Sequence, residues 1–240
     1  MFQMTEEIGR KILSIVDQGL SKGLGQRKEG ETQGEMCVEA AVCYALGLPH
    51  GDDPGCVAPA LRSLKIRLND SNWSSKEARA QGLRRLAIAQ LGSKNELDEK
   101  KFVKRLVDYA IRISTPQALR SAASIIKNEK HKAELYEAAN RCEKEGTRKS
   151  AQQARDITRS ADDPAAYAAY AAAYAAAYAA DDAAVDPVAY AYAAAYAAYA
   201  ADDAAAYASR DKALSDYAEA VVQILIELKA PGCQYLYLTE

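Results

Sequence analysis

The chain has 240 residues, a formal net charge of −2 and an apolar fraction of 49%. This length allows one large helical domain or two small ones, each with a hydrophobic core. The N-terminal sequence MFQMTEEIGR contains no apolar signal core, and aspartate pairs interrupt the Ala-rich part of the chain. We therefore expect a cytoplasmic protein with neither a signal peptide nor a membrane span.

Charge is distributed unevenly along the chain. Residues 1–160 carry 28 Lys and Arg against 21 Asp and Glu, whereas residues 161–240 carry 3 against 12. This change predicts a basic body, 1–160, and an acidic region, 161–240, which packs on the body or on another subunit. The basic excess is modest for a nucleic-acid-binding protein, so a small anion is the favoured partner.

Amphipathic spacing and capping residues predict an all-α protein, a multi-helix bundle with an Ala/Tyr-rich C-terminal helical hairpin region. In the first part of the chain, helices are predicted over 5–17, 36–46, 59–68, 74–91, 102–113, from 116 onward, and over 128–160. Thr5 and Ser74 are predicted N-caps, and Thr115 is predicted to cap a helix that Pro116 opens. The only segment with strand character is 235–238.

The most unusual segment is 161–208, which contains 28 Ala, 9 Tyr and 7 Asp. Asp163-Pro164 and Asp186-Pro187 have the form of an N-cap followed by proline, and we predict helices over 164–180, 187–201 and 203–229. Asp202-Asp203 either caps the last of these helices without a proline or lies inside a longer helix. The first four tyrosines, at 167, 170, 174 and 178, are spaced so that they lie on one helix face. Tyr167, Tyr170 and Tyr174 are therefore either part of a packing seam or a binding surface.

A basic group on two consecutive predicted helices suggests an anion site. Its members are Arg62, Lys65, Arg84 and Arg85, and the turn between the helices holds Asn69 and Trp73. Cations beside an indole suit a phosphate with a stacked base. The alternative is that these cations lie on solvated helix faces and that Trp73 covers the edge of the core. The glycine-rich linker around Lys22 has no Gly-Lys-Ser/Thr ending and is not predicted to be a phosphate loop.

Two catalytic or metal-binding hypotheses arise from the same region. Cys37 lies near a predicted helix N-terminus, where the helix dipole can activate a thiolate, and His131 is its candidate base. The alternative is that Cys37 is a buried apolar residue. His50, Asp52 and Asp53 have side chains that suit a divalent cation, although a turn with a capping aspartate explains them equally well.

The segment GEMCVEAAVCYALGLPHGDDPGCV, starting at Gly34, resembles a block found in uncharacterised proteins of bacteria and their viruses. The Ala-rich segment is similar in composition to the repeats of Imm5-like immunity proteins. Both resemblances imply a setting of conflict between bacteria, toxins and phages, and neither implies a reaction.

These observations favour a non-enzymatic binding protein that sequesters an anionic signalling nucleotide, without a cofactor, as a homo-oligomer joined through its Ala/Tyr helices. Arg62, Lys65, Arg84 and Arg85 would contact phosphate, and Trp73 or a tyrosine would stack on the base. One alternative is a protein-binding immunity or inhibitor module that uses the tyrosine-rich helices or the acidic region. The other is a hydrolase that depends on Cys37.

Overall fold

The fold is α-helical throughout the part of the chain that can be described. The structure is a computed structural model that describes residues 4–25, 35–160, 164–180, 186–203 and 207–240. No β-strand occurs within these ranges, which confirms the predicted all-α class. None of the helices in these ranges is long and apolar enough to cross a membrane.

The helices follow one another with short connections. The α-helices in the described ranges are α1 (Glu6–Val16), α2 (Val38–Ala45), α3 (Pro59–Asn69), α4 (Lys76–Ala89), α5 (Glu99–Tyr109), α6 (Thr115–Ile125), α7 (Glu129–Glu145), α8 (Arg148–Ser160), α9 (Pro164–Ala179), α10 (Pro187–Asp203) and α11 (Tyr207–Glu227). A π-helical turn, η1 (Ala110–Ser114), joins α5 to α6, and a 3-10 helix, η2 (Pro231–Thr239), follows α11. The strand predicted at 235–238 is therefore wrong, since this segment lies in η2 and no described segment offers it a partner strand.

Two compact units make up the chain. Unit 1 comprises Met1–Phe102 and Leu214–Glu240, and unit 2 comprises Val103–Ala213. The change in net charge at residue 160, from which the sequence predicts a domain boundary, falls at the end of α8 inside unit 2. Surface charge and compact packing thus divide this chain at different places, because packing follows the apolar helix faces.

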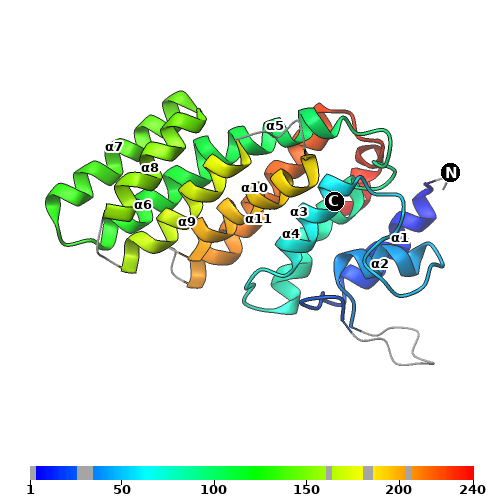
Figure 1. Cartoon of the computed structure of the whole chain (residues 1–240). Helices are drawn as coiled ribbons and strands as arrows, with labels where there is room; N and C mark the ends of the chain where they lie inside the picture. The colour runs from blue at the N-terminus through cyan, green and yellow to red at the C-terminus, as the bar shows by residue number, and fades with distance from the viewer. Residues whose placement is uncertain (1–3, 26–34, 161–163, 181–185, 204–206) are drawn as a thin grey trace. The chain divides into compact units, whose positions relative to one another are not determined.

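In unit 1, α4 packs against α1, α2 and η2 (Figure 1). Buried leucines of α4, such as Leu83 and Leu86, meet a core that also contains Ile12 of α1. Gly232 lets η2 approach the end of α4, because a Cβ there would lie 2.5 Å from the carbonyl oxygen of Ile88. The C-terminal segment of unit 1 is thereby fixed against its central helix.

The helix starts in unit 1 follow the predicted capping chemistry with one shift. Thr5 Oγ1 accepts from the backbone N–H of Ile8 at 3.3 Å, as predicted. The cap of α4 is Ser75, whose Oγ accepts from the N–H of Ala78 at 3.0 Å. Ser74 was expected in this role, and with adjacent serines only the path of the preceding turn decides which one caps the helix.

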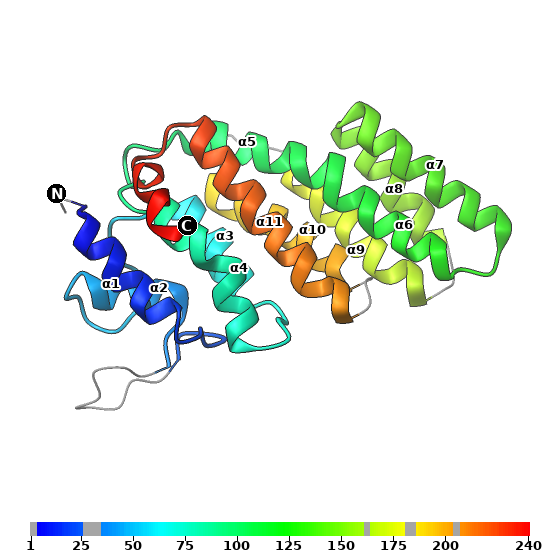
Figure 2. The same cartoon turned by 180° about the vertical axis from the view of Figure 1, so that it is seen from behind.

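Unit 2 is a bundle in which α6, α7, α8, α9 and α10 run side by side (Figures 1 and 2). Each of these helices packs against the next one along the chain, and α9 also packs against α6. Alanines fill the contact faces of α9 and α10. Small side chains let helix backbones approach closely. Many weak van der Waals contacts between small side chains therefore hold this bundle together.

A continuous helical path through α5, η1 and α6 replaces the separate helix that the sequence predicts after residue 115. Thr115 has helical angles, φ −62° and ψ −48°, so it is not an extended N-cap. Pro116 has no N–H to donate to the preceding turn, and the π-helical turn absorbs this interruption. Arg112 in this turn donates to the backbone carbonyl oxygens of Glu143 and Lys144 at 2.8 and 2.9 Å, which caps the end of α7.

The caps predicted for the Ala-rich helices have mixed outcomes. Asp186 Oδ1 accepts from the N–H of Ala189 at 3.1 Å, which confirms it as a cap of α10. Asp163 lies outside the described residues. The expectation that Asp203 starts the last long helix is wrong, and the alternative that Asp202 and Asp203 lie inside a longer helix is confirmed, because α10 continues through Asp203 and α11 begins at Tyr207.

Adding a methyl group at Gly82 should destabilise unit 1. A Cβ at this position would overlap the Trp73 ring and lie 2.8 Å from Ser215 Oγ, so α4 would have to shift. Gly82→Ala is expected to lower the free energy of unfolding by about 1–3 kcal/mol in urea titrations. Gly51→Ala is the control, because its nearest neighbour would lie 3.8 Å away. Equal stability of the two variants would contradict this packing.

Candidate ligand-binding site

The segment after α1 forms one wall of a cavity in unit 1. Gly19 has φ +102°, a conformation that favours glycine, and turns the chain away from the end of α1. The N–H of Leu20 then donates to the carbonyl oxygen of Lys76 at 3.1 Å, and the N–H of Ser21 donates to that of Met36 at 2.9 Å. These bonds bring the segment against the start of α4.

Arg79 in the first turns of α4 supports this wall from inside. Its side chain is buried, with 6% exposure, and Nη1 donates to the carbonyl oxygen of Leu20 at 2.8 Å. Nε donates to the carbonyl oxygen of Asn69, also at 2.8 Å. These two bonds hold the guanidinium group of Arg79 in a fixed orientation.

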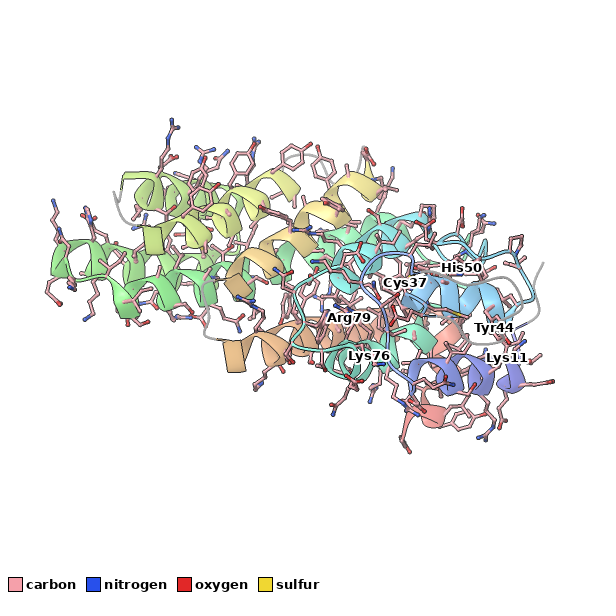
Figure 3. All side chains as sticks on the ribbon, turned by 90° about the horizontal axis from the view of Figure 1, so that it is seen from below. Lys11, Cys37, Tyr44, His50, Lys76 and Arg79 are labelled. Carbon is pink, nitrogen blue, oxygen red and sulfur yellow. The ribbon has the colours of Figure 1, made fainter. Side chains whose placement is uncertain are left out.

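The resulting cavity has a volume of about 410 Å³ and is lined by Ile15, Gln18, Gly19, Leu20, Ser21, Lys22, Glu35, Lys76 and Arg79. Three of the lining side chains are cationic and one is a carboxylate. Figure 3 labels Lys76 and Arg79 on α4. Both lie near the N-terminus of this 14-residue helix, where the positive end of the helix dipole adds to their charge. The site is therefore electrostatically suited to an anion.

The third cation comes from the opposite wall. Lys22 Nζ donates to the side-chain oxygen of Asn72 at 2.9 Å, which holds the ammonium group near the turn that precedes α4. The N–H of Gly23 donates to Asp70 Oδ1 at 2.7 Å, which fixes the backbone beside Lys22. Backbone hydrogen bonds of Leu20 and Ser21 before Lys22, and of Gly23 after it, fix this wall of the cavity in place.

A second cavity in unit 1, of about 540 Å³, has a different character. It is lined by Met4, Gly55, Cys56, Gly92, Lys94, Asn95, Glu96, Pro231, Gln234 and Tyr235. Its two charged side chains, Lys94 and Glu96, have opposite signs. This cavity has no charge preference, so the cation-lined cavity is the stronger candidate for a specific ligand.

The predicted anion ligand Lys65 lies elsewhere, in the core. Its side chain is fully buried, and Nζ lies 2.8 Å from Oε1 of the equally buried Glu39. Nζ also donates to Oε1 of Gln90, so the ammonium group joins α2, α3 and α4. Burial lowers the pKa of Lys65 and raises the pKa of Glu39. Lys65 cannot contact an external phosphate in this position, and its predicted role is wrong.

The three predicted arginine ligands are not brought together either. Arg62 Nη2 donates to Asp52 Oδ1 at 2.7 Å, in the loop before α3. Arg84 Nε donates to Asp17 Oδ1 at 2.8 Å, and Arg85 Nε lies 3.3 Å from Glu219 Oε2. Each guanidinium is directed to a carboxylate of a different segment. Helix periodicity placed these residues on accessible faces, but it did not say which carboxylates lie opposite.

The side chains of Trp73 and Asn69 form hydrogen bonds to the backbone and have structural roles. The Trp73 indole is 6% exposed, and its Nε1 donates to the carbonyl oxygen of Leu68 at 2.9 Å. The Asn69 side chain accepts from the N–H of Val38 at 3.3 Å and donates to the carbonyl oxygen of Ser21 at 3.0 Å. Trp73 thus has no open face for a base, whereas Asn69 supports the wall of the cavity.

Cys37 is the N-cap of α2, with Sγ accepting from the N–H of Ala40 at 3.4 Å. Its side chain is 5% exposed, and burial raises the pKa of the thiol. An activated nucleophile requires the opposite shift. His50 follows α2 in the sequence, and His131 belongs to unit 2, where its backbone N–H donates to Asn128 Oδ1 at 3.2 Å.

The metal hypothesis also finds no supporting geometry. Among the residues described, no group of three or more His, Cys, Asp and Glu side chains is placed to hold a metal ion. Asp52 and Asp53 both face Arg62, with Asp53 Oδ2 3.9 Å from Arg62 Nη1. The Arg62 guanidinium occupies the place near the carboxylates that a cation would need, so His50, Asp52 and Asp53 form part of an ion-paired loop.

The predicted tyrosines do lie together on α9. The ring centroids of Tyr167 and Tyr170 are 6.5 Å apart, and those of Tyr170 and Tyr174 are 6.1 Å apart. These residues belong to unit 2, and the cation-lined cavity belongs to unit 1. The periodicity correctly predicts the shared face and leaves its use open.

Comparison with family models, with curated proteins and with solved structures found no match to this chain. The resemblances to a bacterial and viral block and to Imm5-like repeats therefore stay hypotheses.

Sequence reasoning missed the residues that line the cavity. The sequence patterns predict no site at Lys22, Lys76 or Arg79. The available signal was a capped helix start with two cations in its first turns. That signal is weak, because two cations in the first turns of a helix are common on solvated surfaces. Only the linker that packs beside Lys76 and Arg79 completes the cavity.

Removing one partner of the buried ion pair should be far more damaging than removing both. Lys65→Met leaves a buried carboxylate without its cation, so the free energy of unfolding should fall by about 3–5 kcal/mol. In the double variant Lys65→Met, Glu39→Leu, most of this loss should be recovered, as measured by urea unfolding. Lys100→Met, at an exposed position, is the control. Wild-type stability of Lys65→Met would contradict the observed burial.

The Cys37 thiol should be inert in the native protein. Iodoacetamide at neutral pH is expected to leave Cys37 unmodified, because burial blocks access and the raised pKa keeps the thiol protonated. The same reagent in urea should modify it, as peptide mass spectrometry would detect. Rapid modification of Cys37 in the folded protein would contradict this prediction and support the hydrolase hypothesis.

Proposed function

We propose that this protein is a non-enzymatic binding protein that holds a small anionic molecule in the cation-lined cavity of unit 1. The observation that carries the proposal is the convergence of Lys22, Lys76 and Arg79 on one cavity, in which Glu35 is the one carboxylate among the described lining residues. A buried guanidinium held in a fixed orientation is well suited to phosphate or carboxylate oxygens.

The size of the cavity agrees with this class of ligand. A volume of about 410 Å³ falls in the range of small-molecule sites, roughly 300–1,000 Å³. Ile15 and Leu20 provide an apolar floor beside the cations. A molecule with one or two anionic groups and a compact body fits this combination.

The sequence favours a signalling nucleotide, and the lining residues support only the anionic part of that prediction. None of the described residues that line the cavity is aromatic, and Trp73 is buried against α4. We therefore propose a phosphate- or carboxylate-bearing ligand without a requirement for base stacking. Sequestration of such a ligand needs no chemistry, because binding alone lowers its free concentration.

The test combines identification of the ligand with a charge-removal variant. Native mass spectrometry of protein purified from its producing cells, followed by heat release, should detect a stoichiometric small anion. Isothermal titration with inorganic pyrophosphate should then show binding that Lys22→Ala, Lys76→Ala weakens about tenfold or more, because each charged hydrogen bond contributes about 1.5–3 kcal/mol.

The matched control is Lys100→Ala, Lys104→Ala, which removes the same charge from exposed positions outside the cavity. This control should bind pyrophosphate as the wild type does. Equal weakening by both double variants would mean that only the overall charge matters. That result, or the absence of both a released anion and pyrophosphate binding, would refute the proposed site.

A further inference from the structure

The second cavity of unit 1 plays no part in the proposed anion site. Its volume is about 540 Å³, within the range of small-molecule sites of roughly 300–1,000 Å³. Among the described residues, none lines both this cavity and the cation-lined cavity. Its lining comes from the residue before the N-cap of α1, the loop before α3, the loop between α4 and α5, and η2. We call it the η2 cavity.

Hydrogen bonds between distant segments hold two walls of the η2 cavity in place. The N–H of Lys94 donates to the carbonyl oxygen of Cys56 at 3.1 Å, which ties the loop between α4 and α5 to the loop before α3. The hydroxyl of Tyr235 donates to the carbonyl oxygen of Met4 at 2.8 Å, which ties η2 to the start of α1. The fold itself therefore forms this cavity, and no ligand is needed to assemble it.

One side of the η2 cavity is apolar. Met4 and Pro231 meet at Gly92, where an added Cβ would lie 3.4 Å from Pro231 Cβ and 3.6 Å from Met4 Cγ. Gly92 has φ +71°, a conformation that favours glycine, so this position stays without a side chain. Met4 and Pro231 both line the cavity and offer apolar contacts to a ligand.

Two opposite charges lie on one turn of the lining. Lys94 and Glu96 flank Asn95, whose φ of +67° marks a tight left-handed turn. Both charged side chains are exposed. Within the described parts of the chain, the ammonium group of Lys94 and the carboxylate of Glu96 form neither an ion pair nor a hydrogen bond. Both charges are therefore available to a ligand.

A ligand that complements this lining carries both signs of charge. A molecule with a single charge would be attracted by one of these side chains and repelled by the other. A zwitterion can instead place its carboxylate beside Lys94 and its ammonium group beside Glu96. The side-chain amides of Asn95 and Gln234 add hydrogen-bond donors and acceptors, which suit a carboxylate or a peptide group.

We propose that the η2 cavity binds an apolar amino acid or a short apolar peptide in its zwitterionic form. Lys94 pairs with the carboxylate of the ligand, Glu96 pairs with its ammonium group, and its apolar side chain contacts Met4 and Pro231. A free amino acid and a dipeptide share this chemistry, and the volume of the cavity accommodates either one. The inference is independent of the anion site, because the two cavities have different lining residues.

The test uses the full chain with ¹³C-labelled methionine methyl groups, titrated with L-leucine and with leucyl-leucine. Binding should shift the NMR signal of the Met4 methyl group, which is assigned with Met4→Leu. The signal of Met36, which is 1% exposed and does not line the cavity, should stay unchanged. The compound with the lower Kd distinguishes a free amino acid from a peptide. An unchanged Met4 signal with both compounds would overturn the proposal.

Derivatives of the tighter-binding compound test the two charges one at a time. Its C-terminal amide lacks the carboxylate, and its N-acetyl form lacks the ammonium group. Each derivative should bind the wild type about threefold more weakly or worse, since an ion pair at an exposed site contributes a modest free energy. Equal binding of the parent compound and both derivatives would contradict the proposal.

Variants then assign each charge to its partner. Lys94→Gln should weaken the parent compound to the level of its amide and bind these two equally. Glu96→Gln should do the same for the parent compound and its N-acetyl form. If Lys94→Gln and Glu96→Gln both kept the wild-type preference for the parent compound, the assigned contacts would be wrong.

The matched controls are Lys100→Gln and Glu7→Gln, which remove the same charges from exposed positions outside the lining. Both should bind the parent compound as the wild type does, and so should the double variant Lys22→Ala, Lys76→Ala of the anion site. Circular dichroism melts would confirm that each variant is folded. Equal weakening by the control variants would mean that overall charge, not the η2 cavity, governs binding.

Discussion

A single ammonium group connects the helices on which unit 1 depends. Lys65 extends from α3 into the core, where it meets Glu39 of α2 and Gln90 at the end of α4. Burying both charges is costly, and their close contact offsets that cost only while all three helices stay in place. The Lys65–Glu39 pair is therefore compatible with burial only in the arrangement that brings these three helices together. That arrangement sets the ends of α3 and α4 from which the walls of the cavity are built.

The cavity follows from this arrangement through backbone groups. Asn69 ends α3, and its carbonyl oxygen accepts from Arg79, while its side chain donates to the carbonyl oxygen of Ser21. Arg79 in turn donates to Leu20. The same guanidinium group supports the fold and lines the cavity. Under the proposed function, one side chain therefore combines a structural role with a binding role.

Unit 2 packs its helices through small side chains. Its alanines bring helix backbones close together, and this leaves no space between them for a larger residue. Every tyrosine ring on these faces must then lie outside, where it is exposed or stacked on another ring. Close packing and an aromatic surface are thus two results of one composition. The described part of unit 1 thus contains a cation-lined cavity, and the described part of unit 2 presents exposed tyrosine rings.

The sequence by itself determined the helices and the direction of the tyrosines, because caps and the helical period act within one or two turns. Thr5, Asp186 and the row of tyrosines that starts at Tyr167 were predicted in this way. Boundaries moved where adjacent residues compete, as at Ser74 and Ser75. Only the tertiary structure decided which cations are buried, which form ion pairs and which line the cavity. Lys65 and Lys76 both lie on amphipathic helices, yet one is buried against Glu39 and the other lines a cavity. The partner of a charged side chain is set by the segment that packs opposite it, and no local pattern encodes that segment.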